Sequence, residues 1–312
     1  MGYKVLITAP YMLKEREKVE NLLKSFPLDV FWASVEERAE EDELLKLVPP
    51  FEGMICGDDR ITEKVIDAAN NLKVIVKWGT GIDSINANAA GKRGIPVYRT
   101  PNAFTQPVSD TTLAYILAFC RGVVKNDQIL KNGGWGKPQS FTLSERCIGI
   151  IGFGNVGKAV AKKLKPFECR ILVNDIVPID PGLAGSLGVE LVEKERIYDE
   201  ADIITLHCDL NEASRHMLSQ KAFSQMKRKP YIINTARGPV INEPDLIFAL
   251  QNNALSGAGL DVFEDEPLPK NSPLRKMENV ILASHNSNSS PKYWDKVHEN
   301  SVSMLVKGLG IE

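Results

Sequence analysis

The chain has 312 residues, of which 43% are hydrophobic and 25% are charged, and its formal net charge is −2. This length exceeds what one small core needs, so we expect two domains of ordinary globular composition. A net charge near zero gives no overall basic field, which argues against a nucleic-acid partner. The first residues lack the apolar core of a signal peptide, and no run of eighteen apolar residues follows, so no membrane partner is expected.

The cysteines are scattered and lie mostly inside apolar runs, without the spacing of metal ligands. They are Cys56, Cys120, Cys147, Cys169 and Cys208. We therefore expect reduced, buried thiols in a cytoplasmic protein, and no metal site.

The first hundred residues alternate short apolar runs with charged amphipathic stretches. Strands are expected at residues 4–9, 29–32, 53–56, 72–77 and 96–98. Helical patterns lie between them, as at residues 14–25 and 62–70. This alternation predicts an α/β fold in which helices wrap a parallel sheet.

A long and largely apolar helical pattern covers residues 106–131, and the pair Gly133-Gly134 follows its end. We expect one continuous helix here. Together with the arm Gly133-Gly-Trp-Gly136, this helix suggests a homodimer, although burial within one subunit would explain the apolar pattern equally well.

The middle of the chain carries its most informative pattern. An apolar run at residues 148–151 enters Gly152-x-Gly154-x-x-Gly157, and a helical pattern follows. In such a turn Gly152 permits the sharp bend, Gly154 lets a pyrophosphate approach the backbone, and Gly157 allows helix and strand to pack closely. The pattern predicts a dinucleotide-binding unit.

The residues around this motif indicate which dinucleotide binds. The helix N-terminus at Asn155 and Val156 offers N–H groups and a positive dipole to the phosphates. A second apolar run ends at Asp175, whose carboxylate can accept hydrogen bonds from a ribose, and no cation follows it directly. A carboxylate without a neighbouring Arg favours NAD over NADP.

Further strands are expected at residues 203–206, 231–234, 258–260 and 280–282, with a last helix at residues 291–308 that returns to the N-terminal half. The glycine motif thus opens a second doubly wound unit inserted into the first. We predict a discontinuous substrate domain, residues 1–101 and 286–312, and an NAD-binding domain, residues 102–285.

Chemistry-bearing residues follow three of these strands. Arg237 stands on a loop after the strand at residues 231–234, Asp261 and Glu266 follow the next strand, and His285 follows the last. Because neighbouring parallel strands end at the same edge of a sheet, Arg237, Glu266 and His285 should lie together beside the nicotinamide end of the cofactor. His207, which closes the strand at residues 203–206, should line the cofactor cleft, as should the adjacent Cys208.

With the glycine motif, these residues closely resemble the D-isomer-specific 2-hydroxyacid dehydrogenase family. The resemblance extends from Gly79-Thr-Gly-Ile-Asp83 and Thr100-Pro-Asn102 to the C-terminal third. It implies a two-domain, usually dimeric enzyme in which Arg237, Glu266 and His285 are catalytic. It also implies that Asp261 contacts the nicotinamide side, and that the backbone at Thr235 and Ala236 passes the cofactor.

Each of these residue types suits the chemistry of such an enzyme. Oxidation of a 2-hydroxy acid removes a hydroxyl proton, which a neutral imidazole can accept and, as imidazolium, return in the reverse direction. A carboxylate such as Glu266 favours the charged ring. The planar guanidinium of Arg237 can grip the substrate's carboxylate and keto oxygen.

The choice of substrate depends on residues of the first domain. The backbone N–H groups of Thr80 and Gly81 form an expected carboxylate nest. Lys77 precedes this turn, as a cation does in the phosphoglycerate dehydrogenase branch, so Lys77, with Arg60 and Lys137, would meet a substrate phosphate. The alternative for Lys137 is a solvated side chain on the arm.

The sequence departs from the family pattern at three places. A run of polar residues, Asn286 to Ser290, follows His285 where small glycine-rich residues are usual. Phe104 stands where relatives often carry asparagine, and Asp209 stands where proline is common.

The sequence is compatible with three functions. The first is an NAD-dependent dehydrogenase of 3-phosphoglycerate or a similar D-2-hydroxy acid. The second is a reductase of glyoxylate, hydroxypyruvate or another unphosphorylated 2-keto acid. The third is a corepressor-like protein that senses NAD without turnover, which an intact acid–base pair argues against.

Overall fold

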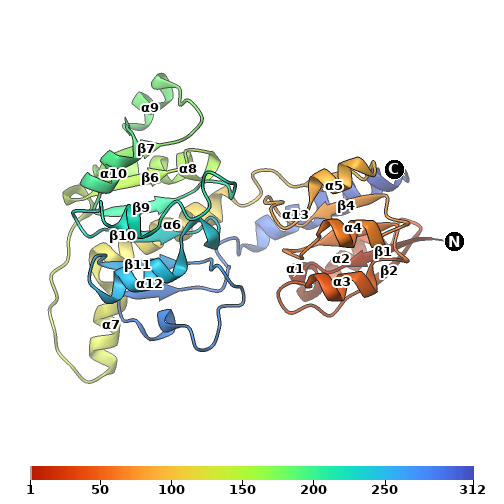
Figure 1. Cartoon of the computed structure of the whole chain (residues 1–312), viewed down its shortest axis with the longest axis horizontal. Coiled ribbons are helices and arrows are strands. Elements are labelled where there is room, and N and C mark those ends of the chain that lie inside the picture. The colour runs from red at the N-terminus through yellow and green to blue at the C-terminus, as the bar shows by residue number, and fades with distance from the viewer. Residues whose placement is uncertain (1) are drawn as a thin grey trace. The chain divides into compact units, whose positions relative to one another are not determined.

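The computed structural model describes residues 2–312, and the chain divides into two compact units (Figure 1). Unit 1 comprises Met1–Phe104 and Ser289–Glu312, and unit 2 comprises Thr105–Asn288. The chain therefore leaves unit 1 after Phe104, forms unit 2, and returns to unit 1 with its last helix.

Unit 1 is a parallel sheet in the order β2-β1-β3-β4-β5, with helices between its strands. Its strands are β1 (Tyr3–Ile7), β2 (Leu28–Trp32), β3 (Gly53–Cys56), β4 (Val74–Lys77) and β5 (Val97–Arg99). Its helices are α1 (Pro10–Lys14), α2 (Arg16–Leu23), α3 (Glu41–Leu47), α4 (Glu63–Ala68), α5 (Ala87–Lys92) and α13 (Pro291–Leu309). Every residue of β3 and β4 is buried, as expected for central strands covered on both faces.

Unit 2 is a second parallel sheet, in the order β12-β11-β10-β9-β6-β7-β8. Its strands are β6 (Cys147–Ile151), β7 (Arg170–Asn174), β8 (Glu190–Leu191), β9 (Ile203–Leu206), β10 (Tyr231–Asn234), β11 (Gly257–Leu260) and β12 (Val280–Leu282). Its helices are α6 (Thr105–Arg121), α7 (Val123–Lys131), α8 (Asn155–Leu164), α9 (Pro181–Leu187), α10 (Lys194–Glu200), α11 (Gln220–Phe223) and α12 (Glu243–Gln251). The strand order reverses between β6 and β9, which is where doubly wound folds bind ligands.

The predicted class, two doubly wound parallel sheets, is confirmed. The prediction of one helix over residues 106–131 is wrong, because Gly122 adopts a left-handed backbone (φ 60°) that separates α6 from α7. Strand β8 was not predicted, since two residues are too short to show a periodic pattern. In Figure 1 the chain from α7 to β6 runs as a long loop along the outside of unit 2.

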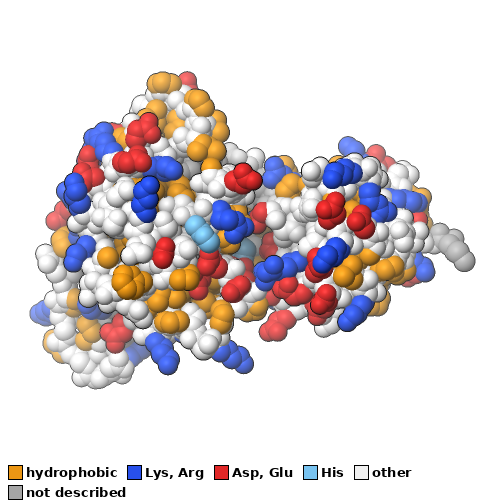
Figure 2. Space-filling model, viewed as in Figure 1, with side chains coloured by type: hydrophobic (Ala, Val, Ile, Leu, Met, Phe, Trp, Pro, Cys, Tyr) orange, Lys and Arg blue, Asp and Glu red, His pale blue; other side chains and the backbone are white. Residues whose placement is uncertain are grey.

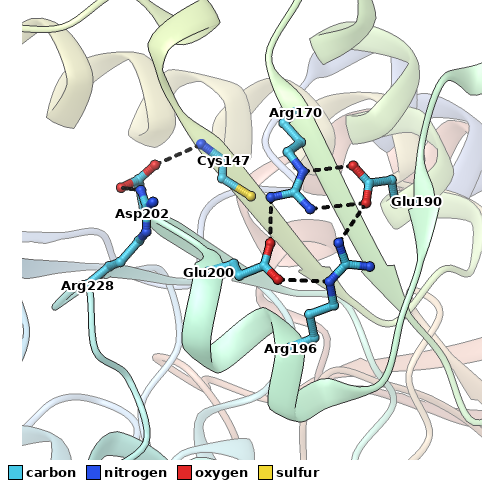
Figure 3. A network of polar contacts seen from close by, with 7 residues as sticks. All are labelled: Cys147, Arg170, Glu190, Arg196, Glu200, Asp202 and Arg228. Atoms are coloured by element: carbon cyan, nitrogen blue, oxygen red, sulfur yellow. Dashed lines mark hydrogen bonds and ion pairs between the residues drawn. The ribbon is translucent and has the colours of Figure 1, made fainter.

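Ion pairs bind the outer strands of unit 2 to α10 (Figure 3). Arg170 on β7 pairs with Glu190 on β8 at 2.7 Å and with Glu200 on α10 at 2.5 Å. Arg196 pairs with the same two carboxylates, at 3.1 Å and 2.8 Å. Because each arginine bridges both glutamates, the four side chains form a closed ring of alternating charge.

The surface mixes both signs of charge. Figure 2 shows Lys and Arg side chains interspersed with Asp and Glu over the face in view, in keeping with the small net charge. Among residues 2–312, no helix is long and apolar enough to cross a membrane. The same residues contain no cluster of three or more His, Cys, Asp or Glu side chains arranged to hold a metal ion.

Candidate active site

At two of the three motif positions, close packing of backbone atoms leaves room only for glycine. At Gly152 (φ 92°) a Cβ atom would lie 2.5 Å from the Cys208 nitrogen, and at Gly157 it would lie 2.2 Å from the Gly152 oxygen. Contacts that short do not occur for real Cβ atoms, so both positions require glycine. At Gly154 a Cβ would meet no atom within 4 Å, so the backbone there borders open space.

The helix that follows this turn fits a pyrophosphate. Helix α8 spans ten residues from Asn155, and its N-cap is Gly154, which has no side chain to cap the first turn. The N–H groups of this turn and the positive end of the helix dipole therefore point toward the open space at Gly154. Together these features match what a dinucleotide phosphate requires.

Asp175 follows β7 directly and is fixed by the glycine turn. Its carboxylate accepts the N–H of Val177 at 2.8 Å and also the N–H of Phe153. The next residues, Ile176 and Val177, are exposed and apolar. The carboxylate thus lies beside the turn without a cation directly after it, the arrangement that suits a free ribose 2′-hydroxyl.

His207 and Cys208 follow β9 directly and lie next to the glycine turn. The His207 Nε2 atom lies 2.9 Å from the Thr205 hydroxyl, and burial lowers the pKa of His207 to about 3. Burial also raises the pKa of the Cys208 thiol to about 11. At neutral pH the structure therefore presents an uncharged imidazole and an uncharged thiol here.

His285 and Glu266, which the sequence predicted to lie together, are in contact. The Nδ1 atom of His285 lies 2.8 Å from Oε2 of Glu266, and the two side chains are only 18% and 16% exposed. The other carboxylate oxygen of Glu266 accepts the N–H of Phe263 at 2.9 Å. With Nδ1 directed at the carboxylate, Nε2 is on the opposite side of the ring.

The backbone of His285 is left-handed, with φ 48°, a conformation that is uncommon for any residue but glycine. Asp261 holds this turn: it is fully buried, and its two carboxylate oxygens accept the N–H groups of Asn286 and Ser287 at 2.9 and 3.0 Å. The His285 N–H donates to the Asp261 carbonyl at 2.7 Å. Asp261 therefore anchors the His285 turn, to which the polar run after His285 contributes its backbone.

Arg237 lies on the loop after β10, and Asn234, which sequence analysis missed, shapes that loop. The buried Asn234 amide donates to the Arg237 carbonyl at 2.9 Å and accepts the Ala236 N–H at 3.0 Å. Thr235 is buried, and its hydroxyl lies 3.1 Å from that of Thr112 on α6. One Arg237 nitrogen donates to the Ala236 carbonyl at 2.8 Å, so the guanidinium is partly oriented by its own loop.

In unit 1 the predicted substrate residues, Lys77, Thr80 and Gly81, lie at the carboxyl end of β4. The Thr80 hydroxyl donates to the Thr100 carbonyl at 3.0 Å, and Arg99 donates to the Thr80 carbonyl at 3.1 Å. These contacts fix the turn that contains Gly81 and leave its N–H groups as the expected nest.

Of the three cations expected to bind a phosphate, Lys77 and Arg60 are paired with carboxylates, and Lys137 is exposed. The Lys77 ammonium lies 2.7 Å from the Asp58 carboxylate, and the Lys77 side chain is 4% exposed against 35% for Asp58. Arg60 pairs with Glu40 at 2.8 Å. Lys77 is therefore buried against a carboxylate that neutralises its charge.

Of the two remaining histidines, one packs in the core of unit 1 and the other lies on the surface. His298 on α13 is buried, accepts the Trp78 indole N–H at 2.9 Å, and contacts Glu15 at 3.1 Å. His216 is exposed and pairs with Glu264.

The parts described so far define a class of protein. A doubly wound unit with a glycine turn, an acid directly after its second strand and an imidazole–carboxylate pair at its strand ends is the architecture of an NAD-dependent dehydrogenase. The family model for the NAD-binding domain of D-isomer-specific 2-hydroxyacid dehydrogenases matches residues 113–287.

Comparison with known proteins agrees with this class. A glyoxylate reductase of Thermofilum pendens is 36% identical over 85% of this chain and 80% of its own length. A hydroxypyruvate reductase of Thermotoga maritima is 33% identical over 99% of both chains. A D-3-phosphoglycerate dehydrogenase of Methanocaldococcus jannaschii is 35% identical over 80% of this chain but only 48% of its own length. A crystal structure of a protein from Thermus thermophilus superposes with a TM-score of 0.83 at 31% identity, covering 98% of this chain and 97% of that one.

This chain belongs to the D-isomer-specific 2-hydroxyacid dehydrogenase family. It is an oxidoreductase of that family, and its cofactor is NAD.

Proposed function

We propose that the protein reduces a small, unphosphorylated 2-keto acid of the glyoxylate or hydroxypyruvate type to the D-2-hydroxy acid. The observation that carries the proposal is the 2.8 Å pair of His285 and Glu266, in the same unit as the glycine turn at Gly152. NADH, when bound, supplies the hydride that reduces the keto carbon.

His285 supplies the proton of this reaction. As imidazolium it donates from Nε2 to the keto oxygen, while Nδ1 keeps its contact with Glu266. The negative charge of Glu266 favours the protonated ring before transfer and holds its orientation. In the oxidative direction the neutral ring takes the hydroxyl proton back, so one residue serves both directions.

Arg237 binds the substrate. Its planar guanidinium offers parallel donors to the substrate's carboxylate and keto oxygen, which fixes the carbonyl carbon and polarises it. We assign unit 1 as the substrate domain, in which the N–H groups of Thr80 and Gly81 hold the carboxylate.

On the cofactor side, we assign unit 2 as the NAD-binding domain. The residues assigned to cofactor binding are Gly152, Gly154, Asn155, Val156, Gly157, Asp175, His207, Cys208, Thr235, Ala236 and Asp261. Within this set, the α8 N-terminus would hold the pyrophosphate and Asp175 the adenosine ribose.

Two observations support an unphosphorylated substrate over 3-phosphoglycerate. The cation that would meet a phosphate, Lys77, is buried against Asp58. The reductases of glyoxylate and hydroxypyruvate match 85% and 99% of this chain, whereas the phosphoglycerate enzyme matches 80% of it.

We also propose that the active form is a homodimer. Helix α7 buries none of its residues within the subunit, and Val123, Leu130 and Trp135 are 59%, 55% and 84% exposed. Apolar side chains gathered on one projecting segment favour a second copy of the chain as their cover.

Replacement of the acid–base residue tests the proposed reaction. We expect His285→Ala to lower kcat for hydroxypyruvate reduction by about 10²–10⁴-fold, the usual contribution of a general acid. The Kd of NADH, measured by fluorescence titration, should change little, because the glycine turn is intact. Glu266→Gln should also lower kcat, whereas Glu278→Gln, at an exposed position before β12, should not. Full turnover by His285→Ala would remove the mechanism.

A further inference from the structure

The segment Phe263–Glu266, which follows β11, determines where the Glu266 carboxylate lies. One oxygen of that carboxylate accepts the Phe263 N–H at 2.9 Å, and the other faces His285 at 2.8 Å. Any displacement of the backbone at Phe263 is therefore transmitted to the contact between Glu266 and His285. The contacts that hold this segment in place therefore help to set the distance between Glu266 and His285.

Gly238 lies against the same segment, backbone to backbone. A Cβ atom at Gly238 would lie 1.9 Å from the Phe263 oxygen and 2.6 Å from the Glu264 nitrogen. Both distances are below 3.0 Å, the shortest contact that real Cβ atoms make. Because the obstructing atoms are backbone atoms, no side-chain rotation relieves the clash. Gly238 directly follows Arg237, so this contact sets the spacing between the Arg237 loop and the segment that carries Glu266.

Glu243 holds the segment from another side. It is the first residue of α12, and its Oε2 atom accepts the Glu264 N–H at 3.2 Å. Burial raises the pKa of Glu243, and the nearby carboxylates of Glu264, Asp265 and Glu266 act in the same direction. Placing a half-buried carboxylate close to three others costs free energy. The hydrogen bond from the Glu264 N–H is the contact by which Glu243 holds the segment.

His216 provides a third contact. Its Nε2 atom pairs with the Glu264 carboxylate, and its backbone N–H donates to the Pro239 carbonyl at 2.8 Å. The left-handed backbone of His216 (φ 52°) directs the residue into this position. The loop after β9, the turn at Gly238 and the Phe263–Glu266 segment are thus joined around Glu264.

We propose that Gly238 and Glu243 are positioning residues for the acid–base pair: they fix the Phe263–Glu266 segment against the Arg237 loop, so that Glu266 stays in contact with His285. Neither residue reacts with the substrate. The inference rests on the proposed function, since it assigns a purpose to the geometry of that same site.

Gly238→Ala tests the backbone contact without changing any charge. We expect the segment to be displaced and kcat/KM for keto-acid reduction to fall by about tenfold or more, because small displacements of catalytic groups are costly. The alkaline limb of the pH profile should move to lower pH, since the imidazolium loses its carboxylate neighbour. Gly185→Ala, where a Cβ would meet nothing within 4 Å, is the matched control and should behave as wild type.

Substitutions at Glu243 test the second contact. They also test the positioning role on their own if Gly238→Ala does not fold. Glu243→Gln keeps an acceptor for the Glu264 N–H and should retain kcat within about threefold, whereas Glu243→Ala should lose about tenfold. Asp245→Ala is the control, because Asp245 lies in the same helical turn but accepts the Gln220 N–H at 2.8 Å instead. It should lower Tm without moving the pH profile.

The outcomes separate this inference from the function itself. If His285→Ala is inactive while Gly238→Ala and Glu243→Ala keep wild-type kcat/KM and pH profiles, the positioning role is wrong and the reaction stands. If His285→Ala is fully active, the proposed reaction fails, and the positioning role fails with it.

Discussion

The ammonium group of Lys77 lies 2.7 Å from the Asp58 carboxylate at the end of two neighbouring strands of unit 1. The register of β3 and β4 pairs Cys56 with Lys77, so Asp58 emerges beside the lysine and beside the turn that starts at Gly79. Asp58 therefore neutralises a cation close to the proposed carboxylate nest. A neutralised cation can still donate a hydrogen bond to a hydroxyl, but it gives little net attraction to a phosphate.

Removal of the Asp58 charge should shift the substrate preference. We expect Asp58→Asn to raise the ratio of kcat/KM for 3-phosphohydroxypyruvate over that for hydroxypyruvate by about tenfold, since one uncompensated, partly buried charge is worth about 1–2 kcal/mol. Steady-state kinetics on both substrates at low salt would measure it. Asp67→Asn, at an exposed site on α4, is the control. An unchanged ratio would mean that Lys77 does not face the substrate's tail.

Part of the site could be predicted residue by residue. The rule that parallel strands end at one edge was enough to place Glu266 beside His285. The rule says nothing about side-chain partners from distant segments, so it missed Asp58 as the partner of Lys77 and the hydrogen bonds that Asn286 and Ser287 donate to Asp261. The left-handed backbone of His285 was also hidden, because no glycine marks it in the sequence.

Among the elements of unit 2, β8 at the sheet edge is joined to β7 and α10 by ion pairs, while the apolar residues of β7 and α10 are buried in the core. Strand β8 has only two residues, and both are exposed. The ring of Arg170, Glu190, Arg196 and Glu200 spans these elements, and its arginines hold the pKa of both glutamates below the usual 4.5. Carboxylates with lowered pKa stabilise the fold at neutral pH, and this contribution is lost as the pH falls below the usual 4.5 and through the lowered pKa.

Opening this ring should have a small effect that depends on salt. Because the side chains are partly exposed, we expect Arg170→Leu to lower stability by only about 1 kcal/mol, or Tm by about 2–4 °C, at low ionic strength. The difference should shrink in 1 M NaCl (an ionic strength at which the Debye length is about 3 Å). Lys227→Met, which breaks an isolated surface pair with Asp199, should leave Tm unchanged. A salt-independent loss would instead indicate that packing of the Arg170 stem stabilises the edge.

At the scale of the whole molecule, the sequence predicts the two-sheet architecture better than it predicts the points at which a helix is broken. Alternating apolar and amphipathic runs were sufficient for two parallel sheets, because buried strands and covering helices have different periods. The break at Gly122 was missed because the apolar pattern continues through it, although a glycine with φ 60° ends one helix and starts the next. That break leaves α7 as a separate helix with none of its residues buried.

The exposed side chains of this segment lead to a prediction about assembly. We expect the wild-type protein to have about twice the 34.5 kDa mass of one chain in light scattering coupled to gel filtration, because apolar surface on a projecting helix favours self-association. Leu130→Asp combined with Trp135→Ser should shift the population toward monomer, with the dissociation dependent on protein concentration. Phe248→Ser, at another exposed apolar position on α12, should leave the mass unchanged. A wild-type protein that is monomeric at every concentration would show that α7 and Trp135 are exposed for a reason other than dimer formation.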